Sequence, residues 1–164
     1  MLRVVSVIRK AQVEAAKVVD RVILDAGDRQ RRRIVLTGEK GTKALLDLDK
    51  PVALRDGDGL LLDDGSIVQV GGEAESLLEI TPSSPRDFVR LAWHLGNRHT
   101  DVQIVEDRIR IRNDHVLADM LRGLGAAVTP LQAAFDPEAG VAQDHRHDHD
   151  HERHPHHHGH SHET

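Results

Sequence analysis

The residues with the clearest chemical meaning lie at the C-terminal end of the chain. From Asp144 to Thr164 the sequence reads DHRHDHDHERHPHHHGHSHET, and ten of these residues are His. Neutral imidazole is a common protein ligand for divalent transition metals, and its combination with carboxylate oxygens suits nickel, copper or zinc. We therefore interpret the segment as metal-binding, with candidate ligands His145, His147, His149, His151, His154, His156, His157, His158, His160 and His162.

Two simpler explanations of this segment can be set beside the metal-binding one. A purification tag is usually an unbroken His run, whereas Asp, Glu, Arg, Pro and Gly interrupt this one. A solvated tail with incidental His would not reach ten His in residues 144–164. Because the segment has no apolar side chain to bury, we expect it to be disordered.

The remaining 143 residues hold three His. His94 lies beside the apolar face of an expected helix, where a structural role is favoured. His99 follows the end of that helix in the motif GNRH, and loops at element ends often carry function, so it is a candidate ligand. His115, in the first turn of a second expected helix, reads as a surface residue. One His cannot hold a metal tightly, but a two-fold homodimer would present His99 twice in an open site suited to metal transfer.

Composition excludes several classes of function. The chain has no Cys, so thiolate metal sites, disulfides and Cys nucleophiles are excluded. Its net charge is −5, which gives no electrostatic support for nucleic-acid binding. The basic run Arg29 to Arg33 contains no aromatic residue and is interpreted as a strand edge or a partner surface. No apolar stretch approaches the ~20 residues of a membrane span, so we expect a cytoplasmic protein with neither membrane nor nucleic acid as partner.

The first half of the chain has the pattern of a small β domain. Strands are expected at Leu2 to Ile8, Val18 to Leu24 and Arg33 to Leu36, and a hairpin at Leu60 to Val70, with Gly-rich and Asp-rich turns between them. We predict an all-β domain over residues 1–71. Its boundary is placed at Gly71–Gly72, interpreted as a flexible dipeptide, because the hydrophobic period changes there.

The second half alternates strands with helices. Its expected elements are a strand at Ser76 to Thr81, a helix from Pro85 with Ser84 as N-cap and Gly96 as stop, a hairpin at Val102 to Arg112, a helix capped by Asn113 or Asp114 and stopped by Gly123 and Gly125, and a strand at Ala126 to Leu131. The order β-α-β-β-α-β is that of a ferredoxin-like domain, here residues 72–143. The fold class is therefore α+β, followed by the His-rich tail at 144–164.

Three motifs in this half carry a family resemblance. They are WHLGNRHTDVQI from Trp93, RNDHVLADMLRGLGAAVT from Arg112 and FDPEAGVA from Phe135, followed by the His-rich terminus. In this order they resemble UreE, the urease accessory metallochaperone family for nickel. The resemblance covers Ser84 to the C-terminus closely, and the first 71 residues only in their general β character.

The resemblance implies a non-enzymatic homodimer whose N-terminal β domain engages partner proteins. It places His99 at the dimer interface, where it binds nickel from both subunits, and gives the tail His extra metal capacity. Nickel would pass to the urease apoprotein complex, with a urease accessory GTPase as direct partner. Asn113 stands where some members have a second His, so His115 is kept as a weaker metal candidate. Asp101 replaces the Pro of many members.

The sequence therefore predicts a nickel metallochaperone for the urease active site, with zinc and copper as competing metals because copper binds most such sites more tightly than nickel. The alternative is a divalent-metal buffer or store that acts through the tail alone. A nickel-loading GTPase would need a phosphate loop, and residues 38–43 have the wrong spacing for one. A hydrolase is disfavoured because no nucleophile and base stand out as a pair.

Overall fold

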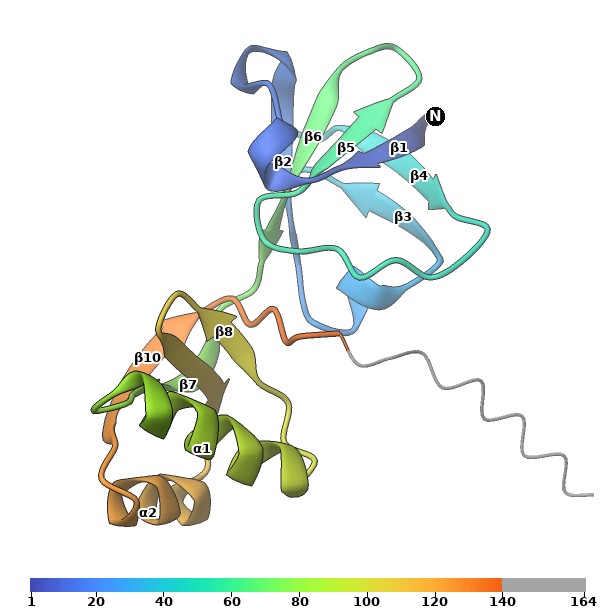
Figure 1. The fold of residues 1–164 in the computed structure, drawn as a ribbon. Coiled ribbons are helices and arrows are strands. Elements are labelled where there is room, and N and C mark those ends of the chain that lie inside the picture. The colour runs from blue at the N-terminus through green and yellow to red at the C-terminus, as the bar shows by residue number, and fades with distance from the viewer. Residues whose placement is uncertain (140–164) are drawn as a thin grey trace, which may run out of the picture.

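The computed structural model describes residues 1–139 of the chain. The ten His of the C-terminal segment, and the prediction that this segment is disordered, lie outside the described residues. Within them, Figure 1 shows two β-sheets that follow one another along the chain. The first contains β1 to β6, and the second contains β7 to β10 with two helices packed against it, so the α+β class is confirmed.

The first sheet has six strands in the order β2-β6-β5-β1-β4-β3. Their bounds are Leu2–Ile8 (β1), Val18–Leu24 (β2), Arg33–Thr37 (β3), Lys43–Asp47 (β4), Gly59–Leu62 (β5) and Ile67–Gly72 (β6). β1 pairs with β4, and β2 with β6, in parallel; the other neighbours are antiparallel. The three expected strands and the hairpin are confirmed. β4 was not anticipated, because its five residues lie between turns and show no long alternation.

This sheet curls until its two ends meet, and Asp20 holds them together. Asp20 lies on the edge strand β2 and is 3% exposed. Its carboxylate accepts hydrogen bonds from the backbone N–H of Lys40 (3.0 Å) and of Thr42 (3.1 Å), in the turn between β3 and β4. A Cβ on Gly38 would lie 2.2 Å from this carboxylate, so only glycine fits there. The closed sheet surrounds a core of aliphatic side chains that includes Leu46, Leu54, Leu60 and Leu62.

Two expectations about the first half are wrong. Gly71 and Gly72 are not a flexible dipeptide: they are the last residues of β6, paired with β2. A Cβ on Gly72 would lie 2.6 Å from the Cβ of Ala134, so this glycine permits close packing. Arg29 is not part of an exposed basic surface either. It is 3% exposed and bonded to the carboxylate of Asp136, which lies after the second sheet.

The second sheet has four antiparallel strands in the order β10-β7-β9-β8. The elements are β7 (Glu75–Thr81), α1 (Pro85–Asn97), β8 (Gln103–Val105), β9 (Arg108–Arg112), α2 (His115–Gly123) and β10 (Ala127–Ala133). Both helices cover the same face of the sheet (Figure 1), which is the expected ferredoxin-like arrangement. Ile109 and Ile111 of β9 are fully buried against Leu95 of α1 and Leu121 of α2.

Local capping fixes where both helices begin. The Ser84 hydroxyl accepts a hydrogen bond from the N–H of Asp87 at 3.1 Å, and Pro85 occupies the first helical position. Asp114, not Asn113, caps α2: its carboxylate accepts from the N–H groups of Val116 and Leu117. These caps were expected from the sequence. α1 continues one residue beyond Gly96.

The closure of the first sheet should depend on pH. Burial raises the pKa of Asp20, but hydrogen bonds from Lys40, Thr42 and Arg21 outweigh it and lower the pKa to about 2, against an ordinary 3.8. A lowered pKa means that the stabilisation is present above pH 3.8 and is lost as the pH falls towards 2. In urea titrations from pH 7 to 2, Asp20→Asn should therefore unfold more easily than the parent at pH 7, and the difference should shrink below pH 4. A difference that is constant with pH would contradict this.

Candidate metal centre

His99 lies immediately after α1, at a defined position of a helix-ending motif. Its own N–H bonds the carbonyl of Gly96 (3.1 Å), and the N–H of Thr100 bonds the carbonyl of Leu95 (3.2 Å). With Arg98 as C-cap, these two bonds make a Schellman motif in which His99 is the first residue past the cap. That position requires the left-handed conformation, and His99 has φ of 54°.

The second helix provides an internal comparison. α2 ends in the same motif: the N–H of Gly125 bonds Arg122, and the N–H of Ala126 bonds Leu121. There the left-handed residue is Gly125, with φ of 90°, as is usual at this position. An L-residue in this conformation costs roughly 1–2 kcal/mol. The chain therefore has His at a site where folding favours glycine, and such outliers occur preferentially at functional positions.

The His99 side chain is exposed, which suits a ligand that must meet another molecule. Two residues further on, Asp101 pairs with Arg112 of β9 at 3.1 Å. His115 follows Arg112 by three residues and is also exposed, as the first residue of α2. The Asp101–Arg112 pair thus joins the segments that carry His99 and His115 at one end of the sheet. Asn113 is occupied elsewhere, since its side-chain amide bonds the Ser76 hydroxyl at 3.2 Å.

Residues 1–139 contain no group of three or more His, Asp or Glu side chains placed to hold one metal ion. Nickel and zinc sites in proteins use four or more donors, of which some can be water. The described part of a single chain therefore supplies too few donors for a metal site. A metal ion bound at His99 would need further donors from a second copy of the chain, from the C-terminal segment or from solvent.

The outer face of α1 exposes apolar side chains that the core does not use. Val89 is 66% exposed and Trp93 is 63% exposed, and their i, i+4 spacing places them on one face of the helix. The Trp93 ring meets the edge of His94 in a T-shaped contact at 5.0 Å between ring centres. His94 is half-buried, in keeping with the structural role expected for it. Sequence periodicity identified the inner face of this helix, but it did not mark Val89 and Trp93 as a surface of their own.

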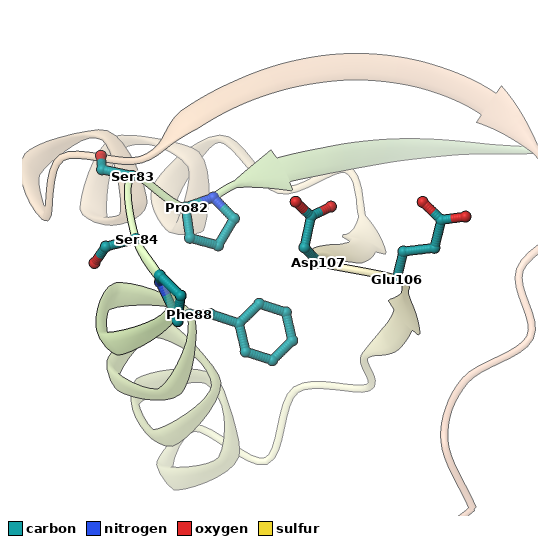
Figure 2. Close-up of a pocket in the computed structure, with 7 residues that line it drawn as sticks. Pro82, Ser83, Ser84, Phe88, Glu106 and Asp107 are labelled. Atoms are coloured by element: carbon teal, nitrogen blue, oxygen red, sulfur yellow. The ribbon is translucent and has the colours of Figure 1, made fainter.

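A hollow of about 390 Å³ lies at the other end of α1 from His99. Figure 2 shows the Phe88 ring pointing from the helix toward the turn at Glu106 and Asp107. The Ser84 hydroxyl is used as the helix cap and the Ser83 hydroxyl bonds the carbonyl of Gly125. No His lines this hollow, so it is separate from the candidate metal centre.

The arginines of β9 do not form a free cationic surface. Arg108 and Arg110 both bond Glu79, at 2.7 and 3.0 Å, and Arg112 bonds Glu75 at 3.0 Å. The hydrogen bond from Arg108 is the largest cause of the lowered pKa of Glu79, so this carboxylate stays charged. The cations that alternate along β9 are thus neutralised by β7.

Comparisons with known proteins cover both halves. A family model described as the UreE urease accessory protein, N-terminal domain, matches residues 2–71, and one described as its C-terminal domain matches residues 75–163. The urease accessory protein UreE of Rhodopseudomonas palustris (strain HaA2) is 54% identical over 121 residues, which are 74% of this chain and 56% of the relative. That of Bradyrhizobium sp. (strain ORS 278) is 53% identical over 74% of this chain and 58% of its own length. That of Chelativorans sp. (strain BNC1) is 44% identical over 88% of this chain and 89% of its own length.

The chain thus spans less than two thirds of the length of the first two of these relatives. No helix within residues 1–139 is both long and apolar enough to cross a membrane.

Substituting the left-handed residue after each helix should show whether folding requires His99. His99→Gly removes the conformational cost at the end of α1 and should leave the free energy of unfolding unchanged or raise it by up to about 1 kcal/mol. Gly125→His places the same strain at the end of α2 and should lower it by roughly 1–2 kcal/mol. Urea unfolding of both variants measures this. If His99→Gly were instead the destabilising change, His99 would have a structural role.

Proposed function

The chain belongs to the UreE family of urease accessory proteins, and we propose that it is a metallochaperone that binds Ni(II) and delivers it for assembly of the urease active site. The observation that carries the proposal is the exposed imidazole of His99 in a conformation that favours glycine. Folding alone would favour glycine at this position, and residues held in such conformations cluster at functional sites. Delivery requires a site that both binds Ni(II) and releases it. A site whose ligands come partly from a second molecule can do both, because it loses ligands when the two molecules separate.

We propose that the site is assembled from two copies of the chain. In a two-fold dimer each copy contributes the same surface, so two His99 imidazoles meet near the axis. The face of α1 that exposes Val89 and Trp93 supports this pairing, because it lies on the helix that precedes His99 and offers apolar area to a second copy. His115 is retained as a secondary ligand on the same end of the sheet.

The C-terminal His residues complete the proposal as the capture site. Ten imidazoles raise the amount of nickel held by each chain, and the body site then receives it. A urease accessory GTPase and the urease apoprotein complex are the proposed recipients, and the cytoplasm is the proposed location. Zinc and copper compete for the same nitrogen donors, so selectivity must depend on metal supply and on the recipient.

The competing function is a metal buffer that acts through the C-terminal His alone. It would leave His99 without a use and would give no reason for its conformation. Nickel titration calorimetry on a chain ended at Gln143 distinguishes the two. Under our proposal this chain binds one nickel per dimer, and His99→Ala abolishes the binding. Absence of nickel binding in the shortened chain, or unchanged binding by His99→Ala, would favour the buffer.

The proposed dimer face can be tested with a charge. Trp93→Asp buries an unpaired carboxylate in the proposed interface and should raise the dimer Kd at least tenfold, which is about 1.4 kcal/mol. Val35→Asp is a matched control, since Val35 is 53% exposed on β3 of the other sheet. Sedimentation velocity gives the oligomeric state of both variants. A Trp93→Asp protein that remains as dimeric as Val35→Asp would place the interface elsewhere.

A further inference from the structure

The third motif of the chain, FDPE at residues 135–138, belongs to no helix or strand but is held by contacts along its length. Phe135 is fully buried, and the guanidinium of Arg112 lies 4.7 Å from its ring centre. The motif contains no His, and both of its carboxylates already have partners within the protein: Asp136 pairs with Arg29, and Glu138 accepts from the N–H of Ile104. We name residues 134–139 the strap.

Arg29, in the turn between β2 and β3, clamps the strap to the first half of the chain. Its guanidinium donates to the carbonyl of Phe135 at 2.7 Å and pairs with the carboxylate of Asp136. The backbone N–H of Asp136 bonds the side-chain carbonyl of Gln103 on β8 at 3.2 Å. Asp136 is therefore tied both to the turn between β2 and β3 and to β8 of the second sheet, and Arg29 is buried.

Glu138 fixes the other end of the strap to the outer edge of β8. Its N–H bonds the carbonyl of Val102 at 2.7 Å, and its carboxylate accepts from the N–H of Ile104 at 3.1 Å. β10 and β8 are the two opposite edges of the four-stranded sheet. Three strand spacings separate them, which is about 14 Å. The strap thus carries the chain across the sheet, from the edge where β10 ends to the edge where β8 begins.

This crossing sets where the last described residues lie relative to His99. Val102 follows His99 by three residues, and Glu138 precedes His145 by seven. Whatever conformation residues 139–145 adopt, seven residues span at most about 25 Å. Without the strap the segment would start from the β10 edge, on the other side of the sheet from the loop that contains His99.

We infer that the strap is a tether anchor that keeps the first C-terminal His residues near His99, and that Arg29 and Glu138 are positioning residues for the hand-over of nickel between the two. The inference rests on the proposed function. Its physical effect is on effective concentration, which falls roughly as the −3/2 power of the length of the connecting chain.

The rate of hand-over can be followed with the single tryptophan. Trp93 is the only Trp of the chain and lies on α1, six residues before His99. Ni(II) bound at His99 is expected to quench its fluorescence. In stopped flow, the full chain is mixed with less nickel than its C-terminal His can hold, and quenching reports the passage of nickel to His99. His99→Ala, which should show no such phase, tests the proposed function separately from the strap.

The length of the tether is changed first. A Gly/Ser spacer of about 21 residues between Gly140 and Val141 lengthens the connection from Glu138 to His145 fourfold without altering a described contact. It should slow the hand-over about eightfold. The same spacer after Thr164 is the control and should leave the rate unchanged. Equal rates for the two chains would overturn the inference.

The anchor is then released by substitution. Glu138→Pro removes both bonds to β8, and Ala139→Pro, one residue along, is its control. Arg29→Gln breaks the clamp, with the exposed Arg31→Gln as control. Glu138→Pro should slow the hand-over several-fold, while the nickel affinity of the same variant ended at Gln143 stays at the parent value. If folded Glu138→Pro hands nickel over at the parent rate, the strap has no such role, even if the spacer slows the hand-over. If Ala139→Pro slows the hand-over as much as Glu138→Pro does, the role of the strap is also contradicted.

Discussion

The number of donor atoms that one chain can offer is the constraint on which this account depends. A divalent nickel ion needs several ligands, and residues 1–139 bring no three of them together. Nickel bound to this chain would therefore be held between molecules or between distant segments of one molecule. Such a site would be weaker than a closed cage of four protein ligands, and under our proposal that weakness permits release to a recipient.

The fold serves this constraint by presenting His99 and not by enclosing it. The Schellman motif after α1 fixes the backbone of His99 through two hydrogen bonds, so the exposed imidazole is attached to a rigid helix end. Behind it, the four-stranded sheet and its aliphatic core hold α1 in place. The strap then crosses the same sheet, so that the last described residues lie at the β8 edge, beside the segment that follows His99.

Features set by neighbouring residues could be read from the sequence, and those set by distant contacts could not. Ser84, Pro85 and Asp114 signalled the helix starts because capping acts within three residues. The burial of Arg29 could not be seen, because its partner Asp136 is 107 residues away. With that partner hidden, the position of Arg29 in a basic run suggested an exposed partner-binding surface. The conformation of His99 was also hidden: the sequence pattern GNRH shows that a helix ends, but not which residue is left-handed.

The central claim is that two His99 imidazoles from two chains share one nickel ion. Crystals of the chain ended at Gln143, grown with Ni(II) and measured on both sides of the nickel absorption edge, would locate the ion directly. A shared ion should give one anomalous peak for every two chains, on the two-fold axis and about 2 Å from an imidazole nitrogen of each His99. A peak bound to a single chain, or one that lies away from His99, would contradict it.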